Sequence, residues 1–380
     1  MKKVIAGIVA FSAVASAYGQ AAEPSRKAPS RTSVQVYGVA DVAMVHYNTK
    51  GASRTTMHTG GSGSRFGILA GEDLGDGWRV NTRLEAGFNM NNGTFSSQNG
   101  VKERFWSRQA YIEVANPELG GLRLGRLEGP TYRFFPTFDP MLIPSMDSWG
   151  VVTTLGVGRP GRGSGTGKPS GFLINPTLRT ENTIGYTSPR WSGLQAKVSY
   201  SLNNGSNVEP RLLETYVDYK SGPLTVGVLY VHASSTSGEG LIRPTKGVSE
   251  IAVGAKYEEG PIQPYFTYIH RSLTDQTIGQ DGSPLNSSSE SVKLFGAAIP
   301  IDGRSSIRLT YGHYSSGSSD QNANSYAIAY LYEFSRSILL TAAVTRMTQG
   351  SDSRWRVFQS PIPQAGEPVN GVTAGINWRF

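Results

Sequence analysis

From residue 34 to the last residue, apolar and polar side chains alternate with a period of two in one segment after another. The last segment is the clearest, with one face made of Val372, Ala374, Ile376, Trp378 and Phe380 and the other of Thr373, Gly375, Asn377 and Arg379. A period of two is that of a β-strand whose two faces meet different surroundings. The same alternation recurs over 213–220, 251–258 and 325–334. It predicts an all-β protein.

The two faces differ in a way that suits a membrane barrel. The apolar face carries aromatic residues at the strand ends, namely Tyr200, Tyr219, Tyr230, Tyr257, Phe334 and Phe380. Transmembrane barrels have such aromatic girdles where the lipid meets water. The other face mixes glycine and small residues with charges, which suits a water-filled lumen. A soluble binding or adhesin β-domain also alternates, and it remains an alternative at this point.

Connections between the segments alternate in length. Short turns are expected at 75–77, 117–121, 189–193, 221–223, 259–261, 301–304 and 335–336, and long polar loops at 48–63, 90–104, 203–210, 234–246, 273–289, 315–322 and 348–369. Short turns at one rim and long loops at the other are typical of outer-membrane barrels. We count 16 strands, an even number that permits antiparallel closure. The prediction is a 16-stranded antiparallel transmembrane β-barrel, wide enough for an aqueous channel.

The connection over 130–178 differs from the others because it is long and contains no convincing strand. A loop of such length within a compact domain usually has a function. It begins with an aromatic stretch that includes Phe134 and Phe135, and it later carries Arg159, Arg162 and Lys168, which could attract anions.

The first 21 residues have the layout of a secretory signal peptide, with a positive start at Lys2 and Lys3, an apolar middle and small residues before the cut. Cleavage after Ala17 or after Ala21 fits the small-residue rule. Residues 22–380 would then form the barrel. An exported chain without cysteine has no disulfides, so its stability must come from a closed sheet or a large core.

The net charge of +8 falls to +6 when the two lysines of the signal are removed. No basic helix or recognition motif accompanies this charge, so we expect no nucleic-acid partner. Lipopolysaccharide phosphates and anionic solutes fit an exported basic protein better. Neither a metal nor a cofactor is expected, since the histidines at 46, 58, 232, 270 and 313 are scattered without ligand spacing.

Several stretches resemble the general porins of Gram-negative bacteria, most closely the basic, anion-selective trimeric porins of β-proteobacteria. The stretches are Val34 to Asp41, Ser64 to Gly67 with Gly71 to Gly77, Leu84 to Phe88, Arg108 to Tyr111, and Leu124 to Arg126. The final Phe380 resembles the terminal aromatic that the barrel assembly machinery recognises. The similarity covers nearly the whole mature chain. Each motif is weak alone, but their order and spacing are specific.

This resemblance implies a homotrimer in which the third long loop of each barrel folds inside and narrows the pore. It also implies that an arginine cluster on the wall faces carboxylates on that loop. Arg65, Arg108 and Arg179 fall on the matching wall positions, and Asp139 fits the acidic position of the loop. The family's second loop acid has no clear match, because Pro144 and Ser145 occupy that region, and loss of a loop carboxylate should favour anions.

Alternation also tests which side chains face the lumen. Because Phe66 and Ile68 would face lipid, Arg65 would face the lumen. The same argument assigns Arg83 and Arg179 to the lumen, and Arg83 and Arg123 are weaker constriction candidates. Arg108 is ambiguous, since it shares its face with Ala110 and Ile112. Arg126 shares its face with Leu122 and Leu124, so we expect it at the rim or in a trimer contact.

We therefore expect an outer-membrane channel for passive diffusion of small hydrophilic solutes, with a preference for anions, and not an enzyme. A substrate-specific channel is the alternative within transport, supported by Tyr132, Phe134 and Phe135 on the long loop. A barrel enzyme would need a Ser-His-Asp constellation near a rim. His58, His232 and His313 are only loop or strand-end residues.

Overall fold

A computed structural model describes residues 32–58, 62–95, 104–141, 179–202, 211–233, 248–273, 289–315, 322–351, 357, 360–361 and 363–380. The predicted signal peptide (1–21) lies outside these residues, as do positions 142–178 of the predicted constricting loop, which include Arg159, Arg162 and Lys168. No helix in the described ranges is long and apolar enough to cross a membrane.

The strands are β1 (Thr32–Asn48), β2 (Ser53–His58), β3 (Arg65–Gly75), β4 (Trp78–Gly87), β5 (Gln109–Asn116), β6 (Gly120–Glu128), β7 (Arg179–Thr187), β8 (Leu194–Ser201), β9 (Leu212–Ser221), β10 (Leu224–Ala233), β11 (Val248–Tyr257), β12 (Gln263–Leu273), β13 (Ser289–Pro300), β14 (Ser305–Ser315), β15 (Ala323–Glu333), β16 (Ile338–Gln349) and β17 (Val369–Arg379). One helix, α2 (Pro130–Phe138), follows β6.

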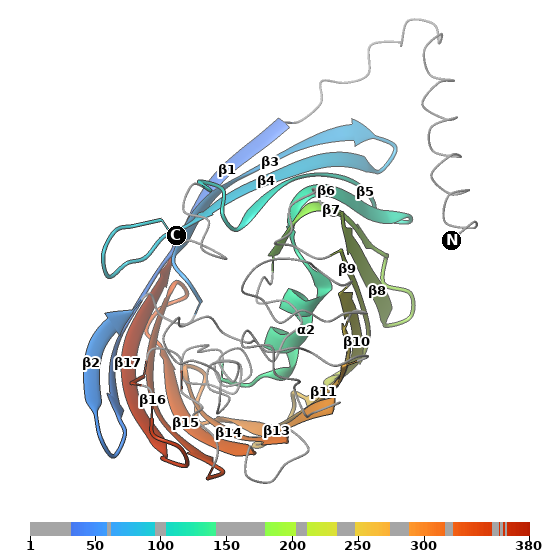
Figure 1. The fold of residues 1–380 in the computed structure, drawn as a ribbon. Coiled ribbons are helices and arrows are strands. Elements are labelled where there is room, and N and C mark those ends of the chain that lie inside the picture. Colours follow the sequence, from blue (N-terminus) through green and yellow to red (C-terminus); the bar gives the residue numbers. More distant parts are fainter. Residues whose placement is uncertain are drawn as a thin grey trace, which may run out of the picture.

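These strands form a closed antiparallel barrel of 16 positions, as predicted (Figure 1). The 17 strands fill 16 positions because β2 and β3 lie end to end beside β1. The first half of β1 pairs with β3, and its second half pairs with β2. The ring closes where β17 pairs with β1 along ten residue pairs, from Val39 opposite Arg379 to Asn48 opposite Asn370. The prediction of a loop over 48–63 was wrong for residues 53–58, which form β2 and extend the wall on the long-loop side.

The seven predicted short turns all join consecutive strands at one end of the barrel, and the strand ends that flank the long connections lie at the other end. We refer to these ends as periplasmic and extracellular, because short turns face the periplasm in outer-membrane barrels. Along β10, Val226, Val228 and Tyr230 point outward and are exposed, whereas Leu229 and Val231 point inward and are buried. The alternation in the sequence therefore separates an apolar outer face from the lumen side.

Phe380 completes the ring. Its backbone N–H donates to the Gly38 carbonyl (3.1 Å), and its own backbone oxygen accepts from the Gly38 N–H (2.8 Å). The Phe380 ring lies on the outer face directly over Gly38, where a Cβ atom would overlap it. The absence of a side chain at Gly38 thus provides the space for the last residue.

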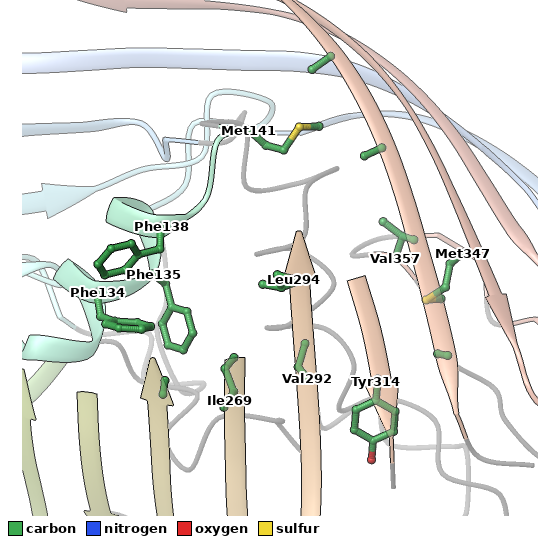
Figure 2. Packing of buried hydrophobic residues seen from close by; sticks show 14 of the residues in the cluster. Phe134, Phe135, Phe138, Met141, Ile269, Val292, Leu294, Tyr314, Met347 and Val357 are labelled. Carbon is green, nitrogen blue, oxygen red and sulfur yellow. The ribbon is translucent and has the colours of Figure 1, made fainter. Parts of the chain in front are cut away.

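Helix α2 lies inside the ring of strands, along the wall formed by β8 to β12 (Figure 1). Pro130 begins the helix, a position where its missing N–H costs nothing. The helix buries three phenylalanines in an apolar cluster inside the barrel, namely Phe134, Phe135 and Phe138 (Figure 2). Inward residues of β9 to β16 complete this cluster, among them Ile269, Val292 and Tyr314.

Candidate functional site

The lumen wall formed by β3, β4 and the residues before β5 carries the first part of an arginine group. Arg65, at the start of β3, donates through Nη1 to the carbonyls of Ser62 (2.6 Å) and Gly63 (3.0 Å). Its Nε lies 3.8 Å from Glu85 Oε2 on β4. Arg108 Nε donates to the other oxygen of the same carboxylate at 2.5 Å. Glu85 therefore holds two arginines, one on each side.

The group continues across β6 and β7. Arg179 donates to Glu128 Oε1 through Nη2 (2.9 Å) and Nε (3.2 Å), and Arg108 Nη2 lies 3.6 Å from the same oxygen. Charge-assisted contacts of this type hold guanidinium groups in fixed positions. The order along the wall is thus Arg65, Glu85, Arg108, Glu128 and Arg179, with acids between the bases. We call these five residues the arginine wall.

Helix α2 touches the arginine wall from the lumen side. Tyr132 accepts a hydrogen bond on its hydroxyl from Arg108 Nη2 (3.2 Å), and the Arg179 guanidinium lies over its ring, 4.6 Å from the centroid. Arg133 Nη2 lies 3.7 Å from Glu128 Oε2 and is nearly half exposed. The described part of the long loop therefore supplies a tyrosine and a fourth cation beside the arginines, and α2 itself contains no acidic residue.

A β-bulge brings Glu128 into this group. The pairing of β6 with β7 shifts between Gly125 and Leu127, and Gly125 has a φ of +136°, a backbone conformation that favours glycine. Before the bulge the even-numbered residues Leu122 and Leu124 face outward. After it, Glu128 faces the lumen and contacts α2. The expectation for Arg126 was wrong for the same reason: it is buried, and its Nε donates to the Ser107 carbonyl (2.8 Å) rather than lying at the rim.

Two features of the opposite wall fix α2. At its N-terminal end, the buried Glu214 carboxylate on β9 accepts hydrogen bonds from the Thr131 hydroxyl and from the Thr131 N–H (3.3 Å). An acceptor here satisfies a backbone donor that the helix leaves unpaired. The same carboxylate accepts from Ser199 Oγ (3.1 Å).

Farther along, Phe138 and Pro140 lie on three lumen-facing glycines of β10, β11 and β13, which are Gly227, Gly254 and Gly296. We call these three residues the glycine track. A Cβ atom on Gly227 would come within 3.0 Å of the Phe138 ring, and one on Gly254 would overlap that ring. One on Gly296 would lie 2.6 Å from Pro140 Cγ. The close approach of α2 to the wall thus depends on absent side chains.

The structure brings Arg65, Arg108 and Arg179 together. Alternation left the direction of Arg108 open because it shares its face with Ala110 and Ile112, and in the structure Arg108 precedes the first residue of β5. The weaker candidates lie nearer the periplasmic end of the same wall. The Arg83 guanidinium lies 5.4 Å from the Tyr37 ring centroid, and Arg123 contacts Glu113 (3.5 Å) and Thr187 Oγ1 (2.6 Å). Asp139 follows α2, is buried, and accepts a hydrogen bond from the Met141 N–H (2.9 Å).

A family model described as Gram-negative porin matches residues 5–352. The chain belongs to this family. Porins are channels, and as a member of the family this chain is an outer-membrane protein.

Among curated proteins, this porin is 26% identical to an outer membrane porin protein of Bordetella pertussis, over 81% of this chain and 87% of that one. It is 25% identical to outer membrane porin protein 32 of Delftia acidovorans, over 94% and 96% of the two chains.

Among solved structures, an anion-selective porin from Comamonas acidovorans superposes with a TM-score of 0.71 at 21% identity, covering 92% of this porin and all of that chain. The trimer form of OmpT from Vibrio cholerae gives 0.63 at 13% identity, covering 92% and 99%. These likenesses support the fold of a porin barrel.

Of the seven residues in the site, sequence reasoning identified the three wall arginines but not Glu85, Glu128, Tyr132 and Arg133 as their partners. Tyr132 and the two phenylalanines after it were signs of a substrate-specific channel. In the structure, Tyr132 holds Arg108 and Arg179, and Phe134 and Phe135 are buried in the apolar cluster of Figure 2. The signal in the sequence is the spacing of Tyr132, Arg133 and Pro136. They occupy positions i, i+1 and i+4, which share one face of a helix, and this face points to the lumen.

Proposed function

We propose that this porin is an anion-preferring diffusion channel whose preference is set by the arginine wall together with Arg133. The proposal rests on the net positive charge of this group. Four guanidinium groups surround two carboxylates, which leaves a surplus of two positive charges. Arginine stays charged even beside other cations.

A fixed surplus of charge in a narrow passage concentrates solutes of opposite sign. We propose that residues 130–178 form the constricting loop. The placement of α2 inside the barrel supports this, because Tyr132 and Arg133 stand against the wall arginines. The solved anion-selective porin of similar fold supports the same preference.

The reversal potential of the purified protein in a planar bilayer, measured across a KCl gradient, tests this function. We expect the sign that corresponds to chloride carrying more current than potassium. A potential of the opposite sign would contradict the proposal while leaving the barrel fold intact.

We propose a homotrimer embedded in outer-membrane lipid, with lipopolysaccharide against its extracellular rim. Outward aromatic residues Phe266, Phe295, Tyr311 and Tyr326 form a continuous row with ring centroids 5.2 to 6.4 Å apart. One step towards the extracellular end, Lys293 stands opposite His313 on the outer face. A cation just beyond an aromatic row lies at the depth where phosphate groups of the lipid are expected.

Deleting Phe380, or replacing it with alanine, is expected to lower the yield of folded trimer while export continues. Deletion removes the two backbone hydrogen bonds to Gly38 as well as the ring, whereas alanine removes only the ring. Heat-modifiable migration on gels measures the folded trimer. Phe380→Tyr is the matched control, because it keeps a ring over Gly38. Normal trimer yield for the alanine variant would show that the ring is not an assembly signal.

A further inference from the structure

A second cluster of arginines lies at the periplasmic end of the barrel, on the side formed by β13 to β17. It lines a pocket of about 360 Å³ between the β13–β14 turn and the β15–β16 turn. Arg304 and Arg336 belong to these turns, and Arg308 and Arg379 belong to β14 and β17. The arginine wall lies on β3 to β7, whereas the pocket lies on β13 to β17 and approaches the wall at Arg379, which stands opposite Val39 as Arg65 does.

The pocket opens towards the lumen. Arg308 stands opposite Ala298 and Ala329, which are buried and inward, so it points inward as well. Arg379 stands opposite the inward and buried Val39. The small alanine side chains leave room beside Arg308. A solute that leaves the barrel on this side therefore passes the pocket.

The four arginines outnumber the carboxylates that act on them, since Arg304 interacts electrostatically with Asp302 and Arg379 with Asp41. None of the ion pairs found among the described residues includes any of them. Arg308 Nε donates to Ser306 Oγ (3.1 Å), and Arg308 also hydrogen-bonds the Tyr265 hydroxyl. Arg379 Nε donates to Asn377 Oδ1 (3.3 Å). The pocket also includes Asp302 and Glu333, which leaves a surplus of two positive charges.

Backbone hydrogen bonds hold the two turns in place. Asp302 Oδ1 accepts from the N–H groups of Arg304 and Ser305, both at 2.7 Å, and these bonds keep the pKa of the Asp302 carboxyl below its ordinary value. The Glu333 N–H donates to the Arg304 carbonyl (2.8 Å), and the Arg379 N–H donates to the Ser337 carbonyl (2.9 Å). The first of these bonds links the two turns, and the second links β17 to the β15–β16 turn. The backbone that carries the pocket arginines is therefore fixed at both turns.

We propose that this pocket binds small divalent oxyanions, such as phosphates and dicarboxylates, at the periplasmic mouth of the pore. A dianion matches the surplus of two charges, and guanidinium forks match both carboxylate and phosphate oxygens. The site is independent of the preference set by the arginine wall and goes beyond the proposed function. Binding must be weak enough for release, as in any conducting pathway.

Line broadening of the ³¹P signal of inorganic phosphate, added to the purified trimer near neutral pH, tests the site. The measurement is made on the Arg65→Ser/Arg179→Ser variant. These two substitutions cancel the surplus positive charge of the arginine wall and Arg133. We expect broadening to persist there and to weaken by about tenfold or more when Arg304→Ser and Arg336→Ser are added, since each removes charge-assisted hydrogen bonds. Arg79→Ser, at an exposed periplasmic position of β4, is the matched control and should leave the broadening unchanged.

Succinate is the second probe and should displace phosphate, which would show that the site takes dianions of both kinds. Heat-modifiable migration checks that each variant forms trimers, and the single Arg336→Ser variant repeats the test with one exposed turn residue. Broadening that disappears already in the Arg65→Ser/Arg179→Ser background, or that survives Arg304→Ser and Arg336→Ser, would overturn the pocket. Failure of succinate to compete would overturn the assignment to dianions. Reversal potentials report on the arginine wall separately, so the two proposals can fail independently.

Discussion

Replacing both Arg65 and Arg179 with serine is expected to remove most of the anion preference of this porin. The two substitutions cancel the surplus of two positive charges in the arginine wall and Arg133. A difference of about 1.4 kcal/mol corresponds to a tenfold ratio. Two unit charges about 4 Å from a passing ion exceed this value once the effective dielectric falls below that of water. We therefore expect the permeability ratio to shift towards cations by about tenfold, as measured by reversal potentials in KCl gradients.

The fold should survive this double substitution, since neither carboxylate loses all its partners. Glu85 keeps Arg108 at 2.5 Å, and Glu128 keeps Arg108 and Arg133 within 3.7 Å. Arg65→Lys/Arg179→Lys is the matched control: it preserves charge and should preserve the sign of the potential. Salt separates this mechanism from one based on exposed charges, because charges on loops are screened beyond about 10 Å at 0.1 M, whereas those in a narrow passage are screened less.

Loop cations provide the rival account. Two results together would support this account. The double serine variant would keep its anion selectivity at about 1 M salt, and substitutions at Arg159, Arg162 and Lys168 would abolish selectivity at low salt. The anion preference would then arise from the loop and not from the arginine wall. Arg123→Ser provides a further comparison, because this arginine already contacts Glu113 and lies nearer the periplasmic end.

The strands could be predicted because each one separates lipid from the lumen along its whole length. Apolar and polar residues must therefore alternate along each strand. This alternation predicts from the sequence that Arg65 and Arg179 face the lumen. It fails where pairing is irregular. Near Gly125 the pairing sets three steps of β7, from Thr183 to Thr180, against two steps of β6, so alternation misplaced Arg126 and gave no reason to expect Glu128 beside Arg179. The φ of +136° at Gly125 cannot be predicted from the alternation of apolar and polar residues.

Helix α2 escaped prediction for another reason. It has only nine residues and contains Pro136, so neither length nor propensity favours a helix there. Its position depends on long-range contacts with Glu214 and with the glycine track, which are separated from it by about eighty residues or more in the sequence. Glycine inside a strand signals a bulge or a close backbone approach. The sequence alone does not say which segment approaches.

The glycine track leads to the second large expected effect, which is on conductance rather than on selectivity. Gly254→Leu places a side chain where the Phe138 ring now lies. Overpacking of this kind costs about 1–3 kcal/mol if nothing moves. The barrel wall is held by strand pairing on both sides of β11, whereas α2 is held by a few contacts, so the helix should move instead. Its direction of movement is into the lumen, and we expect single-channel conductance to fall while the anion preference keeps its sign.

Phe138→Ala separates displacement of the helix from a general effect of the substitution. It removes the ring that collides with the new side chain, so the Gly254→Leu/Phe138→Ala double variant should conduct like Phe138→Ala alone. This non-additivity is the signature of two residues in contact. Equal conductance of Gly254→Leu and the unmodified porin would mean that α2 does not limit the pore. An additive double variant would place the effect of leucine elsewhere in the wall, and the glycine track would then have a role in folding alone.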